Sequence, residues 1–319
     1  MGGVGIDNST IIESAAELGI TTFPQEFLFN KNIAISDMNG NIISENELNV
    51  FTPRIQMSLY KGATIVDENM NVALEFCNGK INTLYGKTFS IIGDSISTYQ
   101  GYLPDGFGTF YPRGDVDDPS YTWWGILESI TGMKLLKNAS WTASRVMGDS
   151  QDSTGKVGCS DKRIAEVADG SVTPDIILIF MGTNDFGYNS PIGSYSYGAA
   201  RPSEGIQETF ADAYSLLLYK LNEAYPLARV YCCTPLLRVR TQGVHEHIFN
   251  DLNESIASYC DMIKKIAYGS ACEIIDLRTC GFNIFNVETY MYERLTHPNK
   301  AGMYIVANAV KNKLELTSN

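Results

Sequence analysis

A change of hydrophobic periodicity at Gly86 constrains the fold of this chain more than any other feature. After this position, short apolar runs with the length of strands alternate with amphipathic stretches of helical length. The strand-like runs are "FSIIGD", "KLLKNAS", "DIILIFMGTND", "ARVYCCTPL" and "CEIIDL". Apolar strands that alternate with helices predict a parallel sheet with helices on both faces. We therefore expect residues 86–319 to form one α/β domain.

The helices expected in this domain lie between and after the strand-like runs. Apolar residues recur at helical spacing, and a glycine closes the first of these segments. The expected helices cover residues 121–132, 203–226, 250–269 and 301–316.

The first 85 residues follow a different pattern. After a short leading segment with one amphipathic stretch at 8–18, "FLFNKNIAISDMNGNIIS" places Asn39-Gly40 between two alternating runs, which is typical of a β-hairpin. Strand-like runs continue up to Tyr85 without a long helix. We expect residues 1–85 to form a small all-β domain that is β-sandwich-like and has about four to six strands.

Charge and composition exclude several classes of function. The chain has 36 acidic and 24 basic residues, a net charge of -12, which argues against binding nucleic acid or anionic membranes. No apolar stretch is long enough to span a membrane, so membrane insertion is not expected. The first residues lack a secretory signal, so the protein is not exported by that route or has lost a leader. Localisation stays open, including an extracellular or phage-particle role.

Cysteines and histidines give no sign of a metal centre. The seven cysteines are odd in number and have no CxxC spacing, which favours reduced residues in the core. His245 and His247 lie two positions apart without a matching cluster of ligands. We therefore expect neither a metal nor a cofactor.

Polar residues that could carry chemistry follow the strand-like runs. Ser95 follows the first run, a loop of small residues follows the second, and Asn184 lies at the end of the third. His297 comes directly before the last helix. In open parallel sheets, ligands bind beyond the carboxyl ends of the strands. These side chains are therefore expected to meet at one edge of the sheet.

Taken in order, these residues resemble the sequence blocks of the SGNH (GDSL-type) hydrolase family across about residues 87–314. The blocks here are Gly93-Asp94-Ser95, Gly182-Thr183-Asn184-Asp185, and His297-Pro298-Asn299 followed by Gly302-Met303. The segments "TWW" and "NASWTASRV" look most similar to gut-bacterial and phage-associated esterase-like members. The resemblance implies a flavodoxin-like three-layer α/β/α domain with a parallel sheet, and a serine esterase activity.

The resemblance also implies a role for each site residue. A serine hydroxyl needs an adjacent base to act as a nucleophile, and His297 is the expected base for Ser95. The oxyanion of the intermediate needs donors already aimed at it. By resemblance these are the Ser95 backbone N–H, the side-chain amide of Asn184 and a backbone N–H at Ala143. Asp94 and Trp141 are candidates for lining the substrate site.

Two positions depart from the family pattern. Ala143 stands where the family usually has glycine, a change that keeps the backbone N–H and that we expect to be tolerated. Arg294 stands where the family usually has its aspartate, three residues before the histidine. Glu293 is the candidate orienting carboxylate, and Asp276 is a second choice. The pattern favours a Ser–His dyad over a full triad.

We interpret the sequence as that of a serine esterase for short acyl esters, with an O-acetyl group on carbohydrate as the expected substrate. The expected partner is thus an acylated small molecule or polysaccharide, and an oligomer is possible. The first alternative is a glycan- or receptor-binding protein, such as a phage tail component or surface adhesin, with a weakly active or inactive hydrolase fold. The second is a thioesterase or lysophospholipase that prefers longer acyl chains.

Overall fold

The structure is a computed structural model of the 319-residue chain. It describes residues 34–36, 63–66, 72–77, 80–239, 249–292 and 296–317, with side chains from residue 82 onward. The chain divides into two units, residues 1–85 and residues 86–319. The division falls where the hydrophobic periodicity of the sequence changes.

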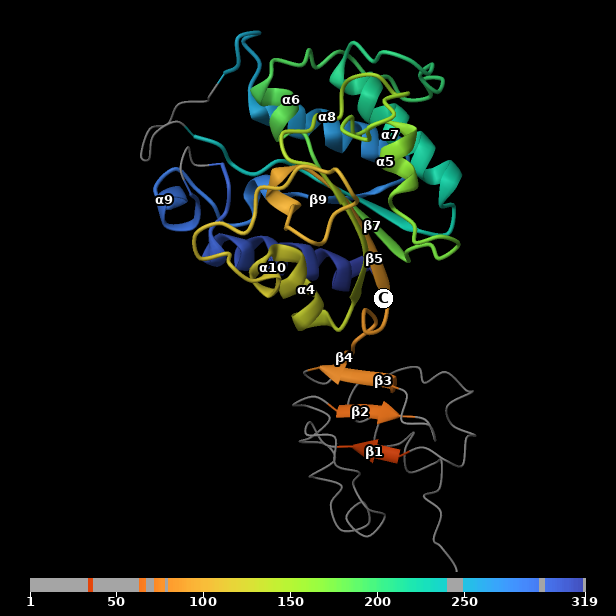
Figure 1. The fold of residues 1–319 in the computed structure, drawn as a ribbon, viewed down its shortest axis with the longest axis vertical. Helices are drawn as coiled ribbons and strands as arrows, with labels where there is room; N and C mark the ends of the chain where they lie inside the picture. Colours follow the sequence, from red (N-terminus) through yellow and green to blue (C-terminus); the bar gives the residue numbers. More distant parts are fainter. Residues whose placement is uncertain are drawn as a thin grey trace, which may run out of the picture. The chain divides into compact units, whose positions relative to one another are not determined.

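The described part of the first unit is an antiparallel sheet (Figure 1). Its strands pair in chain order: β1 (Ala34–Ser36), β2 (Ala63–Val66), β3 (Val72–Cys77) and β4 (Lys80–Ile81). The amphipathic stretch at 8–18 and the Asn39-Gly40 hairpin lie outside the described residues. The expectation of an all-β, sandwich-like domain therefore stays a prediction.

The second unit contains a five-stranded, wholly parallel sheet. Its strands lie in the order β6-β5-β7-β8-β9, which becomes 2-1-3-4-5 when they are numbered within this unit, the flavodoxin-like order. The expected α/β fold with a parallel sheet is confirmed. The strands are β5 (Thr88–Gly93), β6 (Lys134–Ser140), β7 (Ile176–Phe180), β8 (Arg229–Cys233) and β9 (Glu273–Ile275).

Helices cover both faces of this sheet, as Figure 1 shows. On one face lie α4 (Trp123–Thr131) and α10 (Lys300–Thr317), which pack against each other. On the other face lie α5 (Asp161–Ala165), α7 (Phe210–Ala224) and α8 (Ile256–Gly269). Because both faces are covered, all five residues of β7 are buried, which explains its unbroken apolar run.

Two helices begin later than the sequence pattern predicts. The helix expected over 203–226 begins at Phe210, where the Thr209 hydroxyl caps it by accepting the backbone N–H of Asp212. The preceding Gln207 N–H donates to the Gly148 carbonyl and is therefore tied to another loop. The helix expected over 250–269 likewise begins at Ile256.

Several short elements have no counterpart in the sequence prediction. They are α5, α6 (Thr183–Gly187), α9 (Val287–Tyr290) and the 3₁₀ turns Ser95–Ser97, Pro119–Tyr121 and Leu277–Thr279. Elements of three to five residues are too short for a hydrophobic period to appear. In the described ranges, no helix is both long and apolar enough to cross a membrane.

Candidate active site

The candidate site lies where the strand order of the parallel sheet reverses. Strand β5 pairs with β6 on one side and with β7 on the other, so the connections diverge at β5 and β7. Gly93, Ser140 and Phe180 are the last residues of these three strands and lie in register. This switch point is where ligands bind in open α/β sheets.

Ser95 begins the 3₁₀ turn that follows β5 at this edge. The carboxylate of Asp94 caps the turn by accepting the backbone N–H of Ile96 at 3.0 Å. A Cβ atom on Gly93 would lie 2.6 Å from Ser140 Oγ and 2.8 Å from Ser97 Cβ, so only glycine fits there without a shift. The close packing beneath Gly93 thus fixes where Ser95 leaves the strand.

The structure brings His297 to Ser95 across 202 positions of sequence. The Oγ atom of Ser95 and the Nε2 atom of His297 are 2.8 Å apart, a hydrogen-bond distance. The histidine loop is held on both sides, because the Tyr292 N–H donates to the His297 carbonyl and the Tyr111 hydroxyl donates to the Pro298 carbonyl. The pair can therefore transfer a proton between hydroxyl and imidazole.

Burial lowers the pKa of His297. The pKa falls from 6.5 to about 4, chiefly because the partly buried imidazole loses hydration, and secondly because Arg113 and Arg238 repel a positive charge. A histidine with this pKa is neutral at neutral pH. Its Nε2 lone pair is then available to accept a proton from the serine.

The loop after β6 lies beside the start of α6 and is held by it. Asn184, the second residue of α6, donates from Nδ2 to the Ser144 carbonyl at 3.0 Å. The neighbouring Asp185 carboxylate accepts the backbone N–H groups of Val146 and Met147 at 2.9 and 3.0 Å. Asn184 and Asp185 thus position the loop after β6.

Ala143 adopts the left-handed backbone conformation in this loop. Its φ is 56°, in the region that favours glycine. Glycine would be favoured at this position, and alanine is accommodated at the cost of some backbone strain. Alanine keeps the backbone N–H that is expected to act as an oxyanion donor.

Three ionisable side chains near the strand ends of the site are buried: those of Asp94, Asp185 and Arg163. The pKa of Asp94 rises to about 7 and that of Asp185 to about 6, chiefly because burial disfavours the ionised carboxylate. Burial likewise lowers the pKa of the fully buried Arg163 to about 9. The guanidinium of Arg163 donates to four backbone carbonyls, those of Gly93, Ala139, Gly155 and Lys156.

The remaining predicted residues are placed as follows. Asp94 is 1% exposed and caps the Ser95 turn, so its predicted contact with substrate stays a prediction. Trp141 is partly buried and its ring packs on Phe107 at 4.5 Å between centroids. Asp276 accepts from Thr234 and pairs with Lys264. Glu293, Arg294, His245 and His247 lie outside the described residues, so the orienting carboxylate stays a prediction.

Sequence reasoning missed a specific role for Phe110. Its ring stacks on the His297 imidazole, with centroids 3.7 Å apart and planes 11° from parallel. The sequence shows Phe110 only as one of several aromatic residues in the loop after Ser95. No pattern links it to a histidine so far along the chain.

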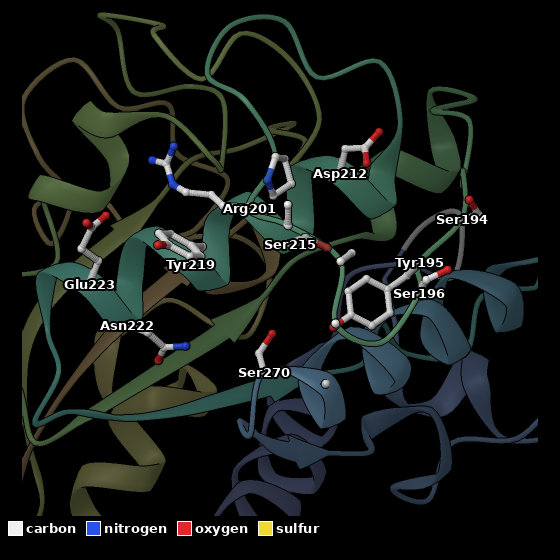
Figure 2. A pocket seen from close by; sticks show the side chains of 15 residues that line it. Ser194, Tyr195, Ser196, Arg201, Asp212, Ser215, Tyr219, Asn222, Glu223 and Ser270 are labelled. Atoms are coloured by element: carbon white, nitrogen blue, oxygen red, sulfur yellow. The ribbon is translucent and has the colours of Figure 1, made fainter.

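A separate open groove of about 600 Å³ lies between the 194–202 loop, α7 and the end of α8 (Figure 2). Tyr195, Tyr219 and Ser270 are among its lining residues, whereas Ser95, Asn184 and His297 are not. The groove is therefore distinct from the candidate active site. In the part of the chain that the structure describes, no cluster of three or more His, Cys, Asp or Glu residues could hold a metal ion.

The strand order defines a flavodoxin-like α/β protein, and the Ser95–His297 pair lies at the switch point of its sheet. The family model of GDSL-like lipases and acylhydrolases matches residues 87–314. The match covers most of the chain, so the chain belongs to the GDSL-like lipase/acylhydrolase family, as the sequence blocks predict.

Solved structures share this fold. A candidate GDSL-like lipase from Bacteroides uniformis is 26% identical, with a TM-score of 0.52, and the match covers 73% of this chain and 96% of that chain. A candidate GDSL-like lipase from Bacteroides ovatus is 24% identical, with a TM-score of 0.51 and coverage of 73% and 99%. A protein from Lactobacillus plantarum, 20% identical, has the same fold, with a TM-score of 0.53 and coverage of 73% and 98%. A comparison with curated proteins finds no match.

Proposed function

We propose that this chain is a serine esterase that hydrolyses short-chain acyl esters, with O-acetyl groups of carbohydrates as its substrate class. The observation that carries the proposal is the 2.8 Å distance between Ser95 Oγ and His297 Nε2 at the switch point of the sheet. Membership in the GDSL-like lipase/acylhydrolase family supports acyl-ester chemistry.

In the acylation step, the Oγ atom of Ser95 attacks the carbonyl carbon of the ester. Nε2 of His297 takes the hydroxyl proton as the new C–O bond forms, and the carbonyl π electrons move onto oxygen. The tetrahedral intermediate then collapses. The bond to the sugar oxygen breaks, and this oxygen receives the proton from the imidazolium, which leaves an acyl group on Ser95.

Three donors are proposed to stabilise the oxyanion: the backbone N–H groups of Ser95 and Ala143 and the side-chain amide of Asn184. The Nδ2 group carries two protons, and one of them is used in the hydrogen bond to the Ser144 carbonyl. The second proton is then available for the oxyanion. Donors fixed in advance lose little free energy in reorganisation as charge develops.

Deacylation repeats these steps with water. His297 Nε2 accepts a proton from a water molecule as the water oxygen attacks the acyl carbon, and the collapse restores the Ser95 hydroxyl with the same proton. The product leaves as acetic acid, which ionises to acetate in solution. A Ser95–His297 dyad suffices for these proton transfers. Glu293 remains the candidate carboxylate for a triad.

The preference for an acylated carbohydrate is supported by aromatic side chains in the segments that follow β5 and β6. Tyr102 is 46% exposed, with its ring packed on Trp124 at 5.1 Å, and Trp141, in the loop beyond β6, packs on Phe107, in the segment beyond β5. Exposed aromatic rings offer flat apolar surface on which a sugar ring can stack. The segments that carry them follow β5 and β6, the strands that lead to Ser95 and Ala143.

The proposal is tested by ester hydrolysis with the Ser95→Ala variant as control. We expect the wild-type protein to release p-nitrophenol from its acetyl ester and acetate from acetylated xylan, and the variant to lose at least about 10³-fold in kcat. Equal rates for both proteins would refute the serine mechanism. If both rates equal the background without protein, the result would favour the alternative of a glycan-binding protein with an inactive hydrolase fold.

Acyl-chain length separates the esterase from the lipase-like alternative. A higher kcat/KM for p-nitrophenyl acetate than for the octanoyl ester supports the short-acyl assignment. A higher kcat/KM for the octanoyl ester, lost in Ser95→Ala, would keep the serine mechanism. It would change the proposed substrate class to esters with longer acyl chains.

A further inference from the structure

The stacking of Phe110 on His297 is the closest ring contact of the candidate site. The centroid separation of 3.7 Å and the 11° angle between planes place the two rings face to face. The hydrogen bond from Ser95 fixes one atom of the imidazole, Nε2. A hydrogen bond at one atom leaves the ring free to turn about that contact, because the χ2 torsion of histidine has a broad energy minimum.

Phe110 is itself fixed by the turn that carries the nucleophile. Its backbone N–H donates to Thr98 Oγ1 at 2.9 Å, and Thr98 Oγ1 in turn donates to the Ser95 carbonyl at 2.9 Å. Thr98 is fully buried. The next residue, Tyr111, binds the Pro298 carbonyl through its hydroxyl at 2.6 Å. The segment around Phe110 thus connects the serine turn to the histidine loop through hydrogen bonds.

We propose that Phe110 is a positioning residue whose ring fixes the plane of the His297 imidazole and keeps Nε2 directed at Ser95 Oγ. The inference rests on the proposed esterase function and deepens it. A restraint on the ring plane is the task that a hydrogen-bonded carboxylate performs in a triad. Phe110 supplies such a restraint through a face-to-face contact, whichever group meets the other imidazole nitrogen.

The Phe110 ring also shields one face of the imidazole from water. Loss of hydration is the chief cause of the low pKa of His297, and the charged groups Arg113 and Arg238 add to it. Arg113 also lies over the Phe110 ring, 4.9 Å from its centroid. Removal of the ring is therefore expected to admit water to the imidazole and to raise its pKa.

The test compares Phe110→Leu, Phe110→Ala and Phe110→Trp with Phe282→Leu. The last is a matched control, because Phe282 is a largely buried ring that packs on Tyr290 at 6.0 Å. We expect Phe110→Leu and Phe110→Ala to lower kcat for p-nitrophenyl acetate on the order of ten- to a hundredfold with little change in KM. Phe110→Trp keeps a flat ring and should restore most of kcat.

A second readout does not depend on activity. The chain has three histidines, so the imidazole resonances can be assigned with a His297→Gln variant and titrated by NMR. We expect His297 to titrate near pH 4 in the wild type and about one unit or more higher in Phe110→Ala, with no shift in Phe282→Leu.

These outcomes separate the two proposals. Wild-type kcat and an unshifted titration in Phe110→Leu and Phe110→Ala would overturn the role of Phe110, as would an equal loss of kcat in Phe282→Leu. If the wild type hydrolyses no ester, the proposed function fails, and the NMR titration alone decides whether Phe110 restrains and shields His297.

Discussion

Asn184 and Ser144 are joined by a 3.0 Å hydrogen bond from the side-chain Nδ2 to the backbone carbonyl. The contact connects α6, which follows β7, to the loop after β6, across the strand β5 that lies between them in the sheet. The amide that is proposed to stabilise the oxyanion therefore also holds the loop that supplies a second donor. Substitution of Asn184 should therefore affect both its own amide donor and the position of the loop after β6.

Substitution of Asn184 by alanine should reduce turnover much more than binding. Loss of one oxyanion donor typically lowers kcat about 10²–10³-fold, and we expect KM to change by less than about threefold. Steady-state kinetics with p-nitrophenyl acetate measures both quantities. A variant with unchanged kcat would exclude Asn184 from the oxyanion site.

Asp185→Asn should weaken the fold at the same loop. The two carboxylate oxygens accept the N–H groups of Val146 and Met147, and an amide can supply only one such acceptor. The unpaired buried N–H should cost about 1–3 kcal/mol in the free energy of unfolding. Denaturant unfolding measures this loss, and an unchanged midpoint with an unchanged slope would contradict it.

Ala143→Gly should keep the activity and relieve backbone strain. The φ of 56° costs an alanine about 1 kcal/mol that glycine does not incur, while glycine loses more entropy on folding. We therefore expect a free energy of unfolding that is unchanged or up to about 1 kcal/mol higher, with unaltered kcat. Ala143→Val is the opposing control, because a branched side chain in this conformation should destabilise the protein. Equal stability of the glycine and valine variants would show that the strain is absent.

The pH dependence of kcat/KM should reflect the low pKa of His297. The imidazole must be neutral to accept the serine proton, and its pKa is about 4. The rate should therefore stay level through neutral pH and fall only as the pH drops through about 4. An acid limb with its midpoint near 6.5, the ordinary value for histidine, would show that the imidazole is hydrated in the free enzyme.

Arg163→Met should destabilise the protein strongly. The buried guanidinium donates to four backbone carbonyls, two of them at the ends of β5 and β6, and the variant would leave these acceptors without their donor. We expect a loss of at least about 3 kcal/mol in the free energy of unfolding, and a smaller loss for Arg163→Lys, which keeps a charge but not the planar set of donors. Equal midpoints of unfolding for wild type and both variants would contradict this role.

The sequence predicts the sheet of the second unit well. Strand β7 is wholly buried and forms an unbroken apolar run, whereas β6 is buried only at its last three residues and is mixed in composition. The run at 134–140 coincides with β6. Helix starts were less predictable. The segment before Phe210 has a helical composition, but the contact between Gln207 and the Gly148 loop competes with helix formation. Such tertiary contacts leave no local pattern.

The site was predictable to the extent that it depends on motifs at strand ends. Ser95 and His297 meet as expected, because the carboxyl ends of parallel strands share one edge of the sheet. The stacking of Phe110 and the burial of Arg163 were not predictable, because each depends on side chains that are adjacent only in the folded chain. The helix that begins at Thr183 was not predictable either, because its five residues are too few to show a hydrophobic period.

Covalent labelling with diethyl p-nitrophenyl phosphate tests the central claim most directly, because this reagent phosphorylates an activated serine whatever the natural acyl group is. We predict that peptide mass spectrometry of the folded wild-type protein finds the diethylphosphoryl group on Ser95, and that His297→Gln reacts at least about 10²-fold more slowly. An unlabelled Ser95, or labelling of Ser95 at the same rate in both proteins, would contradict the account.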